Sequence, residues 1–165
     1  MIRIHGSITS KIDQFDPKFI ALVEASDRLS KKDAALWGPT AAIEAAIRLN
    51  WIDLPQSSRA LLPELDALAA KFRHCRRVIL CGMGGSSLAP EVIAATYQKE
   101  LFVLDSTDPD YLAHALAQDL ATSVVVVSSK SGSTIETACL RALFEERFTN
   151  AGLKPMEHMV IVTDP

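Results

Sequence analysis

Cysteine is scarce in this chain, and its spacing excludes two common uses of the residue. The three cysteines, Cys75, Cys81 and Cys139, are an odd number and contain no C-x-x-C pair. That arrangement argues against a disulfide framework and against a zinc site, and it is typical of a reducing compartment. We therefore expect no bound metal, and we interpret all three cysteines as packing residues.

Long apolar runs and an excess of basic charge are also missing. No apolar run reaches the ~18 residues of a membrane span, and the first residues lack the charged start and apolar stretch of a signal peptide. The formal net charge of −3 gives no general attraction to nucleic acid or to an anionic membrane. The sequence thus predicts a cytoplasmic protein with no nucleic-acid or membrane partner, in which any phosphate recognition is local.

One basic cluster stands out against this composition, and it consists of Lys71, Arg73, Arg76 and Arg77. We interpret it as the last turn of a helix, where cations complement the helix dipole. A site for a polyanion is the less favoured alternative.

The residues that are present divide the chain into two segments. Hydrophobic residues make up 48% of the 165 positions, which is enough for one core of ordinary size. Apolar residues recur at three- and four-residue spacing over 18–30, 40–50 and 59–72, and Asp16-Pro17 is a helix cap followed by proline at the first helical position. These patterns predict a helical segment over residues 1–76 that packs on a sheet formed by the rest of the chain.

Residues 77–165 have a different pattern of apolar residues. Short apolar or β-branched runs at 77–81, 101–105, 123–129 and 159–164 predict strands, and helix-length segments separate them. Continuous apolar strands joined through helices form right-handed βαβ units in a parallel sheet with both faces covered. The predicted fold class is therefore α/β, with helices on both faces of a parallel sheet. The chain stops at VTDP, where a loop to the next helix would begin, so we expect it to be part of a longer protein.

Two glycine-bearing loops follow predicted strands, GMGGSS at 82–87 and SSKSGST at 128–134. Ligands of parallel sheets bind beyond the carboxyl ends of the strands, where the strand order reverses. A short loop of amides and hydroxyls at a helix N-terminus can satisfy the several acceptor oxygens of a phosphate monoester. The serine-rich loop adds Lys130 and a flexible Gly132 to its hydroxyls. We therefore expect the two loops to bind the phosphate of a small metabolite.

Parts of the serine-rich loop have structural alternatives. Ser133-x-x-Glu136 fits a capping box, which would explain both residues without a ligand. Lys130 is equally consistent with a solvated loop cation. Capping does not explain the other hydroxyls, so phosphate binding is assigned first to Ser129, Ser131 and Thr134.

A nucleotide is the chief alternative ligand. Gly82-x-Gly84, with Asp105 at the end of the next predicted strand, imitates the dinucleotide fingerprint, in which an acidic residue about 20 positions on binds a ribose. The imitation is imperfect because Ser87 occupies the third glycine position. The ATP-type loop is absent, since no glycine-lysine pair precedes a Ser or Thr as that motif requires.

GMGGSSLAP and SSKSGSTIET together resemble the paired signatures of the glucose-6-phosphate isomerase family, within the sugar isomerase domain superfamily. RLSKKDAALWG and LNWIDLP are similar to the helical lead-in of bacterial isomerases that are sometimes fused to transaldolase, so the resemblance extends from about Leu29 to the end. It implies an N-terminal sugar isomerase domain with a flavodoxin-like three-layer sandwich. It also implies interconversion of glucose 6-phosphate and fructose 6-phosphate without a cofactor.

Carried over by position, the family's phosphate loop falls on Ser129, Lys130, Ser131 and Thr134, with Lys130 contributing at least its backbone amide. Gly85 and Ser86 match the pair that lines the sugar side of the pocket. Two departures from the family pattern occur. Ser131 stands where many relatives have threonine and keeps the hydroxyl, whereas Ser87 and Ala89 replace the aspartate and glycine of the GGSDLGP form and affect how the first loop meets the sugar.

The resemblance implies a glutamate base, an arginine, a histidine and a lysine for catalysis, all in later sequence. We therefore expect no catalytic residue in this chain, and we interpret its histidines as surface or packing residues: His5, His74, His114 and His158. The expected partners are a hexose 6-phosphate, a second sugar isomerase domain and, as one option, a second copy in a homodimer. A non-catalytic sugar-phosphate sensor and a nucleotide-binding oxidoreductase domain remain alternatives.

Overall fold

The computed structural model of the chain describes residue 13 and residues 15–117 and 119–163. The chain forms two compact units, of which the first ends at Leu65 and the second begins at Asp66. No helix among the described residues has both the length and the apolar character needed to cross a bilayer. His5, whose role we predicted from sequence, lies outside the described residues.

The first unit is helical, as the spacing of apolar residues predicts. Its α-helix α1 (Pro17–Ser30) begins at Asp16, whose carboxylate accepts a hydrogen bond from the Lys18 amide at 2.8 Å, and Pro17 takes the first helical position. This start confirms the predicted cap. The elements that follow are η2 (Ala34–Trp37), α2 (Ala42–Arg48), η3 (Leu49–Asp53), α3 (Leu54–Ser57) and η4 (Ser58–Leu61). Helix α4 (Leu62–Lys71) begins in the first unit and continues into the second.

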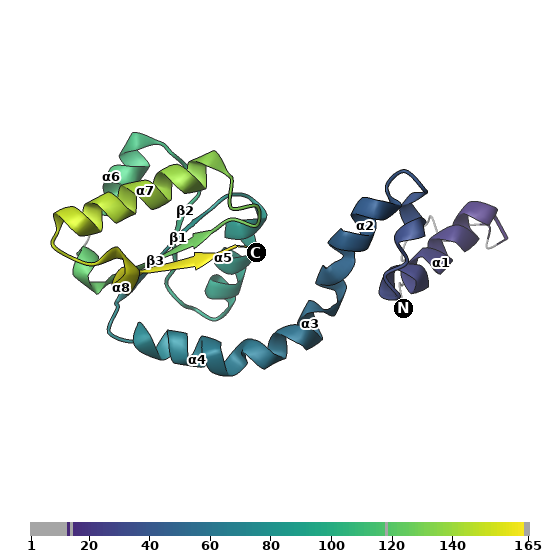
Figure 1. Cartoon of the computed structure of the whole chain (residues 1–165), viewed down its shortest axis with the longest axis horizontal. Helices are drawn as coiled ribbons and strands as arrows, with labels where there is room; N and C mark the ends of the chain where they lie inside the picture. The colour runs from purple at the N-terminus through teal and green to yellow at the C-terminus, as the bar shows by residue number, and fades with distance from the viewer. Residues whose placement is uncertain (1–12, 14, 118, 164–165) are drawn as a thin grey trace. The chain divides into compact units, whose positions relative to one another are not determined.

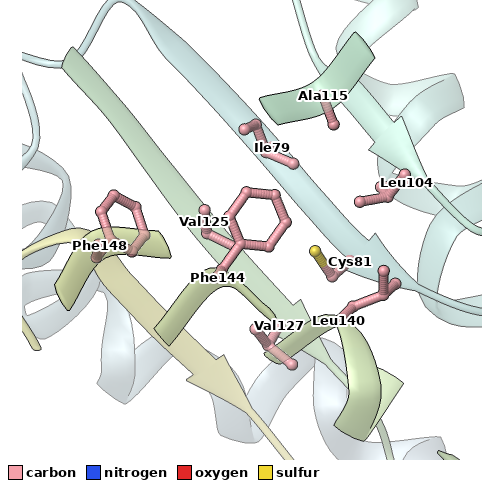
Figure 2. Close-up of a cluster of buried hydrophobic side chains, with 9 residues drawn as sticks. All are labelled: Ile79, Cys81, Leu104, Ala115, Val125, Val127, Leu140, Phe144 and Phe148. Atoms are coloured by element: carbon pink, nitrogen blue, oxygen red, sulfur yellow. The ribbon is translucent and has the colours of Figure 1, made fainter. Parts of the chain in front are cut away.

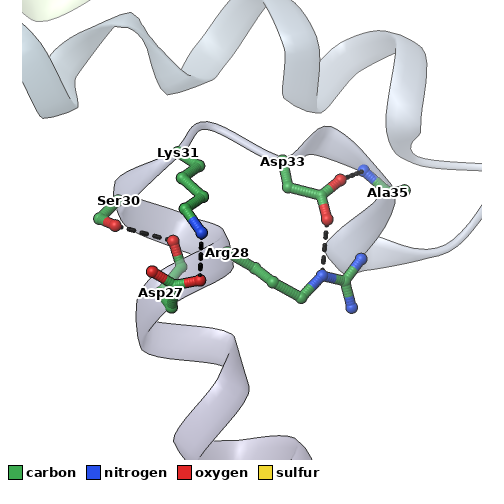
Figure 3. A network of polar contacts seen from close by, with 6 residues as sticks. All are labelled: Asp27, Arg28, Ser30, Lys31, Asp33 and Ala35. Carbon is green, nitrogen blue, oxygen red and sulfur yellow. Dashed lines mark hydrogen bonds and ion pairs between the residues drawn. The ribbon is translucent and has the colours of Figure 1, made fainter.

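A polar network fixes the turn between α1 and η2 (Figure 3). The Lys31 ammonium pairs with the Asp27 carboxylate at 2.6 Å, and Nε of Arg28 donates to the Asp33 carboxylate at 2.6 Å. Asp33 also caps η2 by accepting from the Ala35 amide at 2.9 Å. The hydrogen bond from Arg28 is the largest influence that lowers the pKa of Asp33. The charged form of this carboxyl therefore holds the turn.

The second unit contains a four-stranded sheet with the strand order β2-β1-β3-β4. Its strands are β1 (Arg77–Gly82), β2 (Phe102–Leu104), β3 (Ser123–Ser128) and β4 (Met159–Val162), and all neighbouring pairs are parallel. Strands β2, β3 and β4 lie within runs that the sequence predicts to be strands, and β1 extends one residue beyond its predicted run, to Gly82. The predicted α/β class with a parallel sheet is therefore confirmed.

The helices of the second unit flank this sheet, and they are α5 (Gly85–Thr96), α6 (Pro109–Leu116), α7 (Ile135–Asn150) and the short α8 (Pro155–His158). The chain crosses the sheet in one direction from β1 to β2 and in the opposite direction from β2 to β3 and from β3 to β4. Right-handed connections therefore place α5 on one face of the sheet and α6 and α7 on the other. Figure 1 shows this arrangement, with α6 and α7 on the same side of the strands and α5 opposite.

The main hydrophobic core lies between the sheet and the helices α6 and α7 (Figure 2). Buried residues of α7 recur at helical spacing and pack on alternate residues of the strands. The cluster contains Ile79, Cys81, Leu104, Ala115, Val125, Val127, Leu140, Phe144 and Phe148. His158 stacks on Phe148 with ring centroids 5.0 Å apart, so it is a packing residue as expected.

Two sequence interpretations are wrong at the level of single residues. Cys81 is buried and Cys75 is half-buried, but Cys139 is exposed on α7 and does not pack in the core. The basic cluster does not form one helical turn, because α4 ends at Lys71 and Arg77 is the first residue of β1. Arg76 therefore lies at the entry to the sheet rather than at a helix terminus.

Candidate functional site

The reversal of strand order lies between β1 and β3, which are neighbours in the sheet although β2 separates them in sequence. Gly82 at the end of β1 is the register partner of Ser128 at the end of β3. The two glycine-bearing loops thus leave adjacent strands at the same edge of the sheet. Crevices at this position are where open α/β sheets bind their ligands.

Gly82, at the end of β1, lets the backbones of Ser86 and Ser128 come close to the strand. A Cβ atom added there would lie 2.9 Å from the carbonyl oxygen of Ser86 and 3.2 Å from that of Ser128. The backbones of α5 and β3 therefore approach the end of β1 more closely than any side chain permits. Gly84, the N-cap of α5, has a φ of +55°, which a residue with a side chain rarely adopts.

The two residues assigned to the sugar side of the pocket open α5. Gly85 is the first residue of the helix and is exposed, and Ser86 follows it half-buried. The helix begins without a side-chain cap. Ser87, which occupies the third position of the glycine pattern, is buried and donates its hydroxyl to the Gly84 carbonyl at 3.0 Å. Ser87 therefore closes the turn and is not available to a ligand.

The serine-rich loop gathers hydroxyls at the start of α7. Ser129 is buried; its amide donates to the Val162 carbonyl at 2.9 Å, and its hydroxyl donates to the Thr134 hydroxyl at 3.2 Å. Ser131 accepts from both the amide and the hydroxyl of Ser133, at 3.2 and 3.0 Å. The loop turns at Gly132, whose φ is +67°. Tying Ser129 to the end of β4 holds the loop against the sheet edge.

The capping-box interpretation of this loop is wrong. The N-cap of α7 is Thr134, not Ser133, and its side chain makes no capping hydrogen bond. Ser133 is bonded within the loop instead, and Glu136 lies in the first turn of the helix. Within the described residues, the first amides of this 16-residue helix thus have no side-chain acceptor at the N-cap. An anion placed there would be favoured by both the free N–H groups and the helix dipole.

Thr137 is a polar residue of this region that the sequence interpretation missed. It lies in the first turn of α7, and its buried hydroxyl has no hydrogen-bond partner in the part of the chain that the structure describes. Together with Ser129 and Gly132 it lines a cavity of about 400 Å³ beside the loop. Its spacing from the N-cap Thr134 gives its place in the first turn, but the burial of its hydroxyl depends on tertiary packing and leaves no signal in the sequence.

Two charged residues belong to the alternative interpretations, Lys130 and Asp105, and neither forms an ion pair within the described residues. Lys130 is exposed in the loop, and Asp105 is exposed directly after β2, next to the end of β1. The geometry at Asp105 fits the dinucleotide pattern, but the third glycine position does not. Within the described residues, no group of three or more histidine, cysteine, aspartate or glutamate side chains could hold a metal ion.

The fold and these loops define an α/β domain that presents two polar loops at the reversal point of a parallel sheet. No protein-family model matches the chain. It is 31% identical over 165 residues to the glucose-6-phosphate isomerase of Chlamydia trachomatis, and 28% identical over 187 residues to that of a Cyanothece species. These alignments include 96% and 91% of this chain, but only 30% and 34% of the two relatives.

Solved structures show the same relationship. The crystal structure of a glucose-6-phosphate isomerase from Chlamydia trachomatis superposes with a TM-score of 0.60 at 30% identity, covering 82% of this chain and 27% of that one. A hypothetical protein of Thermus thermophilus, TT0462, superposes with a TM-score of 0.69 at 26% identity, over 92% of this chain and 37% of that one. The chain is therefore a distant homologue of glucose-6-phosphate isomerase, and it corresponds to the N-terminal portion of that enzyme.

Proposed function

We propose that the two loops hold a hexose 6-phosphate as part of an aldose–ketose isomerase that interconverts glucose 6-phosphate and fructose 6-phosphate in the cytoplasm. The observation that carries the proposal is the group of loop hydroxyls at the uncapped start of α7, beside the glycine-rich loop at the reversal point of the sheet. Homology to the isomerases agrees with it.

In this proposal the phosphate contacts the hydroxyls of Ser129, Ser131 and Thr134 and the backbone amide of Lys130. The bond between the Ser129 and Thr134 hydroxyls shows that both side chains point toward one place. That bond breaks when the two hydroxyls turn to phosphate oxygens, which are stronger acceptors because they are charged. Gly85 and Ser86 line the sugar side, where the absence of a Cβ at Gly85 leaves room for the ring.

The reaction itself needs a base that moves a proton between adjacent carbons and a cation that stabilises the enediolate. We propose that these groups lie outside the 165 residues, since the chain spans about 30% of the length of the curated relatives it matches. The chain alone would then position a substrate without turning it over. A second sugar isomerase domain would be its partner, and a homodimer is compatible with the same site.

Calorimetry with fructose 6-phosphate tests the proposal. The Ser129→Ala/Thr134→Ala variant is expected to bind about 2–4 kcal/mol more weakly than the native chain, because each hydroxyl donates a hydrogen bond to a charged oxygen. Thr149→Ala is the matched control: its hydroxyl lies near the other end of α7 and donates to the Glu145 carbonyl, so the affinity should not change.

Equal affinity of the double variant and the native chain would contradict the assignment of the loop to phosphate. Tighter binding of NAD than of fructose 6-phosphate would favour the dinucleotide alternative at Gly82-x-Gly84 and Asp105. Sugar-phosphate binding by a full-length protein that performs no turnover would favour a non-catalytic sensor.

A further inference from the structure

A second cavity lies at the opposite end of the sheet from the two loops. It has a volume of about 640 Å³, within the range of small-molecule sites, and it is formed at the amino ends of the strands. Arg77 and Ser123, which line it, are register partners at the starts of β1 and β3. No residue of the proposed phosphate site lines it.

Three cations line this cavity, Arg76, Arg77 and Lys99. None of them forms an ion pair with a carboxylate in the described part of the chain. Arg77 is held in one orientation, because Nη1 donates to the Ala115 carbonyl at 3.0 Å and its guanidinium lies 4.4 Å from the centre of the Phe102 ring. A guanidinium has five N–H donors, so most of those of Arg77 remain for a ligand.

Neither of the two carboxylates that line the cavity forms an ion pair with these cations among the described residues, and three cations against two carboxylates leave the lining with a positive balance. Asp119 is engaged as a cap, accepting from the Ala121 amide at 3.0 Å and from the Thr122 hydroxyl at 3.2 Å. Glu100 is exposed and forms no ion pair among the described residues. Burial lowers the pKa of Arg77, which is the effect expected where a guanidinium loses water without gaining a counter-ion.

We propose that this cavity is a second ligand site, for a small polyanion that carries phosphate or carboxylate groups. Guanidinium groups match both kinds of group with paired hydrogen bonds, and the preset orientation of Arg77 lowers the entropic cost of binding. The charges of Arg76 and Lys99, on the segments that precede β1 and β2, attract a ligand with more than one charged group. The site is independent of the proposed isomerase function.

The test is an amide NMR titration of the full chain with citrate and, separately, with pyrophosphate. Both anions are expected to shift the amides of residues 76–78 and 99–102. Arg76→Gln and Lys99→Gln are each expected to weaken binding about fivefold, the effect of one exposed charge pair. Glu100→Gln is expected to tighten binding, because it removes the repulsive carboxylate. Arg147→Gln changes the net charge equally at an exposed residue that does not line the cavity, and it should alter the affinity less than about twofold.

Three results would overturn the proposal. The first is a titration in which neither anion shifts residues 76–78 and 99–102 at millimolar concentration. The second is an equal effect of Arg76→Gln and Arg147→Gln, which would show that only net charge matters. The third is weaker binding by Glu100→Gln. If the first result comes with shifts confined to residues 129–137, the anions bind at the phosphate loop and not at this cavity.

Discussion

Gly82 is the residue on which the geometry of the proposed site depends most. Its hydrogen takes the place where a Cβ would meet the backbone oxygens of Ser86 and Ser128, which belong to α5 and β3. Gly82→Ala is therefore expected to cost about 1–3 kcal/mol of unfolding free energy, as in other overpacked sites, and to weaken binding of fructose 6-phosphate by separating the loops. Urea unfolding and calorimetry measure the two effects.

Gly85→Ala is the control for the stability effect, since a Cβ at Gly85 would meet no atom within 4 Å. Its unfolding free energy should stay within about 0.5 kcal/mol of the native value. A Gly82→Ala variant as stable as Gly85→Ala would show that the three backbone segments are not packed as described.

The cysteines differ in environment, and their reactivity should differ accordingly. Burial raises the pKa of the Cys81 thiol to about 12, and it also raises the pKa of Cys75. Because the thiolate is the reactive form, a thiol reagent at pH 8 should modify the exposed Cys139 first and Cys75 more slowly. Cys81 should react only after unfolding. Mass spectrometry of the modified peptides over time gives the order, and early labelling of Cys81 would contradict its burial.

At the scale of elements, α7 connects the core to the candidate site. Its residues Thr137, Leu140, Phe144 and Phe148 form a buried stripe, while its first turn faces the serine-rich loop. Phe144→Ala is expected to cost about 3–5 kcal/mol of unfolding free energy, the usual cost of removing a fully buried phenylalanine.

Ile135→Ala, at an exposed apolar residue of the same helix, is the matched control and should cost less than about 0.5 kcal/mol. Denaturant unfolding followed by circular dichroism compares the two variants. A small and equal loss of unfolding free energy in the two variants would show that α7 is not part of the cooperative core.

The elements also show what could be predicted from the sequence. The strands were predictable because buried parallel strands are continuous apolar runs, and the start of α1 because Asp16-Pro17 is a local signal. Our interpretation of Cys139 as a packing residue was wrong although the helical spacing indicates its exposure, since Cys139 falls off the buried stripe of Leu140 and Phe144. The start of α7, with Thr134 as its N-cap, could not be predicted from the sequence. The Ser129 amide bonds to Val162 of a strand far along the chain, and no local pattern contains that contact.

The candidate site was predictable to a similar extent. The glycine and serine spacing predicts two anion-binding loops, and the sheet places both at adjacent strand ends, while the binding itself stays a prediction. Sequence could not reveal the buried hydroxyl of Thr137, because its burial depends on how α7 packs beside β3. The cavity at the amino ends of the strands could not be predicted from the sequence either, since residues from three separate segments line it.

At the scale of the whole molecule, the chain combines a helical unit with an α/β unit and corresponds to the N-terminal portion of much longer isomerases. In the proposed function, these residues bind the phosphate, and residues outside them carry out the proton transfer. Binding energy from the phosphate would position the reacting carbons for groups that the rest of the enzyme supplies. This division requires that the chain recognise the phosphate on its own.

The most direct test is an amide NMR titration of the full chain with fructose 6-phosphate, with unphosphorylated fructose as the reference ligand. We expect saturable shifts at residues 129–137 and 82–86 with fructose 6-phosphate, and none at the same concentration with fructose, because most of the proposed contacts are to the phosphate. Shifts centred elsewhere, or equal shifts with both sugars, would contradict the claim that the two loops form a phosphate site.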